Sequence, residues 1–87
     1  MAITVRYFAA VREQLGAEER WSWGDADDNP PETVGALLVW LQGRSPAHAQ
    51  ALGRAGLRMA LNQDMCEADA ALTDGAEVAF FPPVTGG

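Results

Sequence analysis

A single amphipathic helix, predicted between two pairs of alternating segments, is the feature that most constrains the fold of this chain. Thr33 is a suitable N-cap for that helix, and Gly43 is a suitable end. Between them, four apolar residues recur at the spacing of one helical face: Val34, Leu37, Leu38 and Leu41. Because the helix is apolar along this stripe, we expect it to pack across a sheet built from the flanking segments.

Those flanking segments have the composition and the alternation of β-strands. The predicted strands cover residues 2–8, 18–23, 57–62 and 77–81. In the first strand, the side chains divide between two faces, with Ile3, Val5 and Tyr7 on one and Thr4, Arg6 and Phe8 on the other. Pro82 and Pro83 end the last strand, because neither residue can donate a hydrogen bond to a ladder.

Two shorter helical segments complete the predicted elements. One is a turn over 9–15 ended by Gly16, and the other runs from Ser45 to about Arg54 with Pro46 at its first position. The order of elements predicts an α+β domain, a mixed sheet with one main helix packed across it and a second short helix. The first and last strands would then lie side by side, as in the ubiquitin-like β-grasp fold. Periodicity alone also permits a ferredoxin-like unit, but the single long helix favours the β-grasp.

The size of the chain limits it to one domain. It has 87 residues, 48% of them hydrophobic, which is enough for one compact core. We expect residues 1–81 to form the domain and residues 82–87 to form an extended tail. A core of this size rarely also encloses a deep pocket, so a non-catalytic carrier, adaptor or subunit is favoured over a self-contained enzyme.

The charge of the chain points to its partners. Six arginines and no lysine oppose twelve acidic residues, and the net charge is −6. This acidity disfavours binding to nucleic acids and to anionic membranes, and it suits a protein partner with a basic surface. The single cysteine, Cys66, allows no internal disulfide, and the N-terminal sequence lacks the features of a signal peptide. We therefore expect a cytoplasmic location.

The last predicted strand leads into a thin tail made of Pro82, Pro83, Val84, Thr85, Gly86 and Gly87. The two prolines favour an extended backbone, so these six residues span roughly 19–20 Å, enough to enter the active site of another protein. Such a tail delivers the α-carboxylate of Gly87. A carboxylate is a poor electrophile and needs activation, most simply as an acyl-adenylate made from ATP.

Residues 72–87 closely resemble the C-terminus of the small subunits of molybdopterin synthases. Residues 7–13, YFAAVRE, resemble the first strand and turn of the same family, and residues 60–63 resemble one of its later strands. The resemblance covers the whole chain and is specific at its two ends. The chain departs from the family at Ala76, where an acid is common, in the acidic segment 21–31, and in its lack of lysine. None of these departures touches the tail.

The resemblance implies a ubiquitin-like sulfur carrier. An ATP-dependent activating enzyme would adenylate Gly87, and a sulfur donor protein would convert the adenylate to a thiocarboxylate. The tail, from Pro82 through Pro83, Val84 and Thr85 to Gly86, would insert into the large subunit of a heterotetrameric synthase. There the sulfur would attack a cyclic pyranopterin phosphate to form the molybdopterin dithiolene. Each product needs two sulfur atoms and therefore two carriers loaded with sulfur. No cofactor is expected on this chain, and the acid–base groups are expected on the large subunit.

Strand parity adds a predicted surface at the root of the tail. Phe8 and Phe81 fall on the face opposite the core residues, so neighbouring first and last strands would form an exposed aromatic patch. Such patches mark partner-binding sites. Arg12 is a candidate for an ion pair at the rim of this interface, and an internal pair with Glu13 or Glu77 is the equally weighted alternative.

Three other groups receive structural interpretations. Acidic neighbours at Asp64 and Glu67 oppose ionisation of the Cys66 thiol, and His48 has no partner for a metal site. The tryptophans at positions 21 and 23 are expected in the core or at the sheet edge, rather than as a platform for stacking nucleic-acid bases.

Two further functions remain open. The first is that of a carrier of the same fold that serves thiazole, cysteine or tRNA sulfuration. The amino-acid sequence of the tail favours molybdopterin synthesis over these pathways. The second is that of a ubiquitin-like modifier or a plain binding module. A modifier would join Gly87 to a target lysine, and a binding module would keep its activity without Gly87.

Overall fold

The computed structural model describes residues 1–26 and 29–83, and its elements follow the predicted order. They are β1 (Ala2–Tyr7), α1 (Ala9–Leu15), β2 (Glu18–Ser22), α2 (Val34–Gln42), α3 (Pro46–Leu52), β3 (Arg58–Leu61), β4 (Asp64–Met65) and β5 (Glu77–Phe81). The predicted elements agree with these bounds to within one or two residues. The two-residue strand β4 is an addition.

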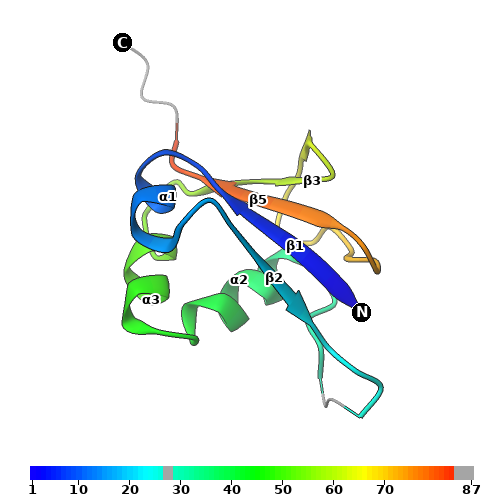
Figure 1. The fold of residues 1–87 in the computed structure, drawn as a ribbon. Helices are drawn as coiled ribbons and strands as arrows, with labels where there is room; N and C mark the ends of the chain where they lie inside the picture. The colour runs from blue at the N-terminus through cyan, green and yellow to red at the C-terminus, as the bar shows by residue number, and fades with distance from the viewer. Residues whose placement is uncertain (27–28, 84–87) are drawn as a thin grey trace.

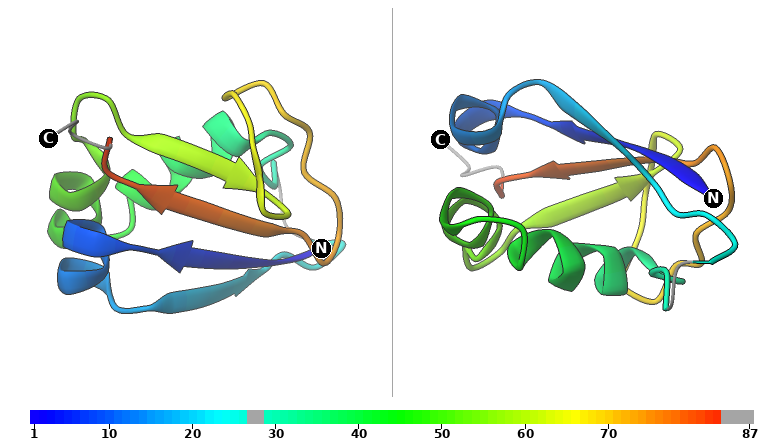
Figure 2. Two further views of the ribbon diagram at one scale, coloured as in Figure 1. Left: turned by 90° about the horizontal axis from the view of Figure 1, so that it is seen from above. Right: turned by 60° about the horizontal axis from the view of Figure 1, so that its bottom comes forward.

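The five strands form one mixed sheet in the order β2-β1-β5-β3-β4. The first and last strands, β1 and β5, are parallel neighbours near the centre, with Tyr7 opposite Phe80, and the other pairs are antiparallel. Helices α2 and α3 lie across one face of the sheet, whereas α1 lies at one end of it (Figures 1 and 2). The predicted β-grasp arrangement is therefore confirmed.

The core lies between α2 and the sheet, as the apolar stripe predicted. Val34, Leu37 and Leu41 are fully buried, and Leu38 packs at the edge of the same cluster. The Thr33 hydroxyl oxygen accepts a hydrogen bond from the backbone N–H of Ala36, 3.1 Å away, and so caps the helix. Facing these residues, the sheet contributes buried side chains of β1 and β5: Ile3, Val5, Tyr7, Val78 and Phe80.

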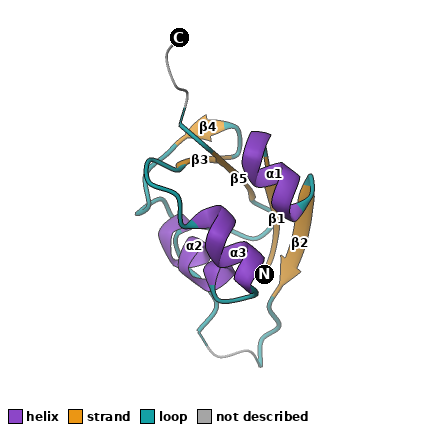
Figure 3. Cartoon of the chain, turned by 90° about the vertical axis from the view of Figure 1, so that its left-hand side faces the viewer, coloured by secondary structure: helices purple, strands orange, loops and turns teal. Residues whose placement is uncertain are grey.

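Three tryptophans close one side of this core. The ring of Trp40 on α2 meets Trp21 and Trp23 edge to face, at centroid distances of 4.8 and 5.0 Å. The Arg44 guanidinium stacks on the Trp40 ring, 4.1 Å from its centroid. The tryptophans are thus part of the packing, as predicted, and α3 packs in turn against both α1 and α2 (Figure 3).

The hairpin between β3 and β4 was not predicted. Its two turn residues, Asn62 and Gln63, both have positive φ, at 50° and 72°. That pair of angles is typical of a tight type I′ turn, which usually carries glycine. Asn62 suits a positive φ, but Gln63 stands where glycine is usual, so the common Asn-Gly signal for this turn is absent. The turn also serves the sheet, because the Asn62 side-chain oxygen accepts a hydrogen bond from the N–H of Glu77 at 3.0 Å.

Candidate functional site

The aromatic patch, Phe8 and Phe81, lies where β1 and β5 end. The two rings meet edge to face with their centroids 6.5 Å apart, and Phe8 is 41% exposed. Their position follows from the register, because the Tyr7–Phe80 pair places the next residue of each strand side by side. The backbone N–H of Phe8 donates to the carbonyl of Phe80 at 3.3 Å and holds the two strand ends together. The two rings are therefore in contact as predicted, with Phe8 exposed and Phe81 half-buried, and their role in binding a partner stays a prediction.

The patch belongs to the open face of the sheet, which we define as the face opposite α2 and α3 (Figure 2). Arg6 lies in the middle of this face, with its guanidinium 5.7 Å from the centre of the Phe8 ring. It also faces the Glu77 carboxylate at 3.9 Å. The Nε atom of Arg6 is buried without a hydrogen-bond partner among the described residues. This arginine is held against the patch by packing, and part of its hydrogen-bonding capacity is unused.

Arg12 is exposed on α1, one turn beyond the patch. Its backbone N–H donates to the carbonyl of Phe8 at 3.3 Å, which fixes the start of α1 beside the aromatic ring. Within residues 1–26 and 29–83, no carboxylate lies within ion-pair distance of its guanidinium. Glu77, one of the two internal partners considered, faces Arg6 instead. Among the two interpretations of Arg12, the geometry favours a guanidinium available to a partner.

The third cation at the site, Arg58, is a residue that sequence reasoning missed. It begins β3 directly opposite Phe81, so the two side chains share the open face. Its place beside the patch depends on the pairing and register of β3 with β5, which the sequence alone does not supply. The patch is thus flanked by arginines from three elements: Arg6, Arg12 and Arg58.

The described part of the tail consists of Pro82 and Pro83. Pro82 is half-buried and Pro83 is exposed, directly after the end of β5. Val84, Thr85, Gly86 and Gly87 lie outside the described residues. The predicted roles of the tail and of its terminal carboxylate therefore remain predictions, as does the division of the chain after residue 81.

His48 belongs to a partly buried polar cluster that ties α3 to the sheet. Its Nδ1 lies 2.7 Å from the Ser45 hydroxyl, and its Nε2 lies 2.8 Å from the Glu19 carboxylate. The Tyr7 hydroxyl donates to the same Glu19 oxygen at 3.0 Å. Burial, together with the Glu19 charge and hydrogen bond, raises the pKa of Tyr7 far above its ordinary value. The cluster joins packed elements, in agreement with a structural role for His48.

Cys66 is poorly suited to nucleophilic chemistry. Burial raises the pKa of its thiol, and the neighbouring carboxylates of Glu67 and Asp69 raise it further. Among the residues that the structure describes, no group of three or more histidine, cysteine, aspartate or glutamate side chains is placed to hold a metal ion. No helix in the same residues has the length and apolar character needed to cross a membrane.

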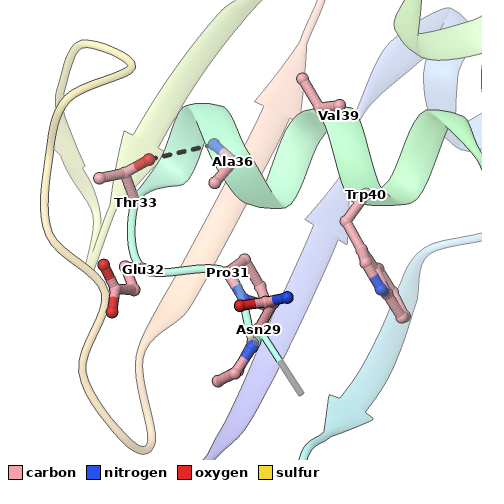
Figure 4. A pocket seen from close by; sticks show the side chains of 8 residues that line it. Asn29, Pro31, Glu32, Thr33, Ala36, Val39 and Trp40 are labelled. Carbon is pink, nitrogen blue, oxygen red and sulfur yellow. Dashed lines mark hydrogen bonds between the residues drawn. The ribbon is translucent and has the colours of Figure 1, made fainter. Parts of the chain in front are cut away.

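A groove of about 600 Å³ runs beside α2 from the segment before its N-terminus to Trp40, on the helical side of the sheet (Figure 4). Its walls include Pro31, Val39 and Trp40, and among the described residues that line it Glu32 is the one ionisable side chain. The Thr33 hydroxyl at its edge is already used as the helix cap. The described lining therefore offers no pair of acid–base groups, and the groove lies away from the aromatic patch.

Comparisons with known proteins agree with these features. A model of the ThiS family matches residues 5–87. The molybdopterin synthase sulfur carrier subunit of Escherichia coli is 46% identical over 85 residues, which cover 98% of this chain and 99% of that protein. The solved structure of SAMP1 from Haloferax volcanii has a TM-score of 0.71 at 26% identity and covers 100% of both chains. A chain in the complex of subunits 1 and 2 of the molybdopterin-converting factor from Helicobacter pylori has a TM-score of 0.66 at 24% identity and the same coverage.

Proposed function

This chain belongs to the ThiS family, and on that premise we propose that it is the sulfur carrier subunit of a molybdopterin synthase. Its close relative in Escherichia coli bears that name, in agreement with the resemblance found at the two ends of the sequence. The proposal makes the chain a reactant that other proteins load and discharge. In this proposal the acid–base groups for the chemistry belong to those other proteins.

One observation carries the proposal furthest: the aromatic patch lies at the point where β5 leads into the tail. Phe8 and Phe81 are in contact on the open face, and Pro82 and Pro83 follow at once. Exposed aromatic pairs are frequent anchors of protein interfaces. A partner that binds the patch is thereby placed next to the start of the tail. Binding of a partner at the patch would therefore also bring that partner next to the segment that leads to the C-terminus.

The proposed chemistry takes place at the carboxylate of Gly87. One of its oxygens attacks the α-phosphorus of ATP on an activating enzyme, and pyrophosphate leaves. Hydrosulfide supplied by a donor protein then attacks the acyl carbon, AMP leaves, and the tail carries a thiocarboxylate. A thiocarboxylate is ionised at neutral pH and has a soft, nucleophilic sulfur, so it suits attack on a cyclic pyranopterin phosphate. ATP is consumed by the activating enzyme, and this chain binds no cofactor in the proposal.

The proposed main partner is the large subunit of the synthase. Support comes from the Helicobacter pylori structure, which is a complex of subunits 1 and 2 of a molybdopterin-converting factor. The arginines beside the patch suit carboxylates at the rim of the partner's interface. The net charge of −6 on this chain suits a partner whose binding surface is basic inside that rim. A heterotetramer and a cytoplasmic location are part of the same proposal.

A single-turnover experiment tests this function. The thiocarboxylated chain is mixed with the large subunit and cyclic pyranopterin phosphate, and both the carrier and the pterin are followed by mass spectrometry. Discharge of two carriers for each dithiolene formed is expected. A carrier that stays loaded while in complex with the large subunit contradicts the proposal.

A ubiquitin-like modifier is the second candidate function, and the likeness to SAMP1, a small archaeal modifier protein, favours it. In that case Gly87 becomes joined to a lysine of another protein. The adduct is then a branched polypeptide, whereas the sulfur carrier gives no conjugate.

A further inference from the structure

Pro83 packs against a glycine on the neighbouring strand connection. Because β3 and β5 are antiparallel, the register that pairs Arg58 with Phe81 brings Gly56, two residues before Arg58, opposite Pro83, two residues after Phe81. A Cβ atom built on Gly56 lies 3.2 Å from Cγ of Pro83 and 3.6 Å from its Cβ. The 3.2 Å distance to Cγ is shorter than an ordinary van der Waals contact, whereas the 3.6 Å distance to Cβ is an ordinary one. The proline ring therefore rests on the bare backbone of Gly56.

The backbone of Gly56 is itself constrained by a turn. The N–H of Leu57 lies 3.4 Å from the carbonyl of Arg54, and Gly56 has a φ of +77° at the third position of that turn. This angle is typical of the third residue of a type II turn, where glycine is favoured. Because β3 starts at Arg58, the turn is connected directly to the strand that pairs with the end of β5.

We propose that the turn 54–57 is a seat for the tail and that Gly56 is a positioning residue for tail delivery. The seat holds Pro83 at a defined place relative to the aromatic patch, so that the following residues start from one point when a partner binds Phe8 and Phe81. This inference rests on the proposed function, because it assigns the seat a role in presenting Gly87. It adds a contact that the tail makes with its own domain.

The chain offers a matched control in Gly75. This residue also occupies the third position of a turn, between Thr73 and Ala76, with a φ of +82° and a 3.1 Å hydrogen bond from the N–H of Ala76 to the carbonyl of Thr73. Beyond its chain neighbours, no heavy atom of the described residues lies within 4 Å of a Cβ built there. Alanine at either position suffers similar backbone strain, but only alanine at position 56 meets the tail.

The first test is structural and does not depend on the proposed function. In the wild-type chain, nuclear Overhauser contacts are expected between the Hα protons of Gly56 and the ring protons of Pro83. In Gly56→Ala, the resonances of Pro83 shift, whereas in Gly75→Ala they do not. Absence of the wild-type contact, or equal shifts in both variants, overturns the seat.

The second test measures sulfur charging by the cognate activating enzyme, ATP and a sulfur donor. Gly56→Ala is expected to lower kcat roughly tenfold, because the tail is misplaced, with KM within about twofold because the docking surface is intact. Gly75→Ala keeps both constants within about twofold of wild type. The Pro83→Ala substitution removes the ring that clashes with a side chain at position 56. In a chain that already carries Pro83→Ala, Gly56→Ala should therefore lower kcat by less than it does in the wild-type chain.

The outcomes distinguish failure of the positioning role of Gly56 from failure of the proposed sulfur-carrier function. Equal loss of kcat in Gly56→Ala and Gly75→Ala, or a loss unchanged by Pro83→Ala, overturns the positioning role while the carrier function stands. A wild-type chain that shows the Gly56–Pro83 contact but accepts no sulfur overturns the proposed function, and the positioning role with it.

Discussion

The ring of Phe8 contacts the ring of Phe81 edge to face at 6.5 Å, although the two residues lie near opposite ends of the chain. The contact exists because β1 and β5 are parallel neighbours whose ends coincide. The same topology brings the start of the tail to this aromatic pair, of which Phe8 is exposed and Phe81 is half-buried. A partner surface and a reactive terminus are thus joined by one pair of strands.

Replacing Phe81 by alanine is expected to weaken binding to the large subunit more than it weakens folding. Loss of a central aromatic anchor costs about 2 kcal/mol of binding free energy, or roughly a 30-fold rise in Kd. The cost to folding is about 1 kcal/mol, because Phe81 is only half-buried and loses mainly the contact with Phe8. Calorimetric titration and urea unfolding measure the two quantities.

The control is Val39→Ala, which truncates a side chain that is 69% exposed on α2, on the helical side of the sheet. This variant should bind like wild type. Equal affinities for wild type and Phe81→Ala would remove the aromatic patch from the interface.

Replacing Arg12 by glutamine should slow association with the large subunit and reduce its dependence on salt. Arg12 has no ion-pair partner within the described part of its own chain, so its guanidinium is available to carboxylates at the rim of a partner. Exposed pairs contribute about 0.2–1 kcal/mol, and rim charges act mainly on the association rate. Stopped-flow binding at two ionic strengths measures the effect. Arg44→Gln, on the tryptophan side, serves as the control, and an identical salt slope for both variants argues against Arg12.

Stability is expected to fall at alkaline pH because of Tyr7. The ordinary pKa of tyrosine is 10.0, and in the folded protein the pKa of Tyr7 is raised far above that value, so its hydroxyl stays protonated at higher pH. Above about pH 10 the unfolded chain therefore releases a proton that the native state keeps, and the free energy of unfolding drops by at most about 1.4 kcal/mol per pH unit. Tyr7→Phe should flatten this slope. Urea unfolding at about pH 8 and about pH 10.5 makes the comparison, and a slope unchanged in Tyr7→Phe excludes this cause.

His48→Ala should destabilise the domain by about 1–2 kcal/mol, because it removes a 2.8 Å hydrogen bond from the partly buried Glu19 carboxylate. Sulfur charging of the tail should be unaffected, since the cluster contributes packing and no chemistry. Unfolding curves and a charging assay on the same preparation give both values. A stable variant that cannot be charged would show that His48 has a functional role.

Much of the fold could be predicted because local patterns agree with it. The alternation in residues 2–8 and 77–81 placed Phe8 and Phe81 correctly, and the stripe from Val34 to Leu41 identified the covering helix. Other features depend on contacts between distant segments. Arg58 joins the site through strand pairing alone, and Gly56 acquires its contact only once Pro83 is opposite. Likewise, the Tyr7–Glu19–His48 cluster joins three elements whose mutual packing no single segment specifies.

The most direct test of sulfur carriage is the intact mass of the chain after incubation with a cognate activating enzyme, ATP and a sulfur donor. A copy that lacks Gly87 is treated in parallel. The wild-type chain should gain the mass that exchanges one oxygen for one sulfur, and the truncated chain should gain nothing. An unchanged wild-type mass, or an adduct that carries a second polypeptide, would contradict the assignment of this chain as a sulfur carrier.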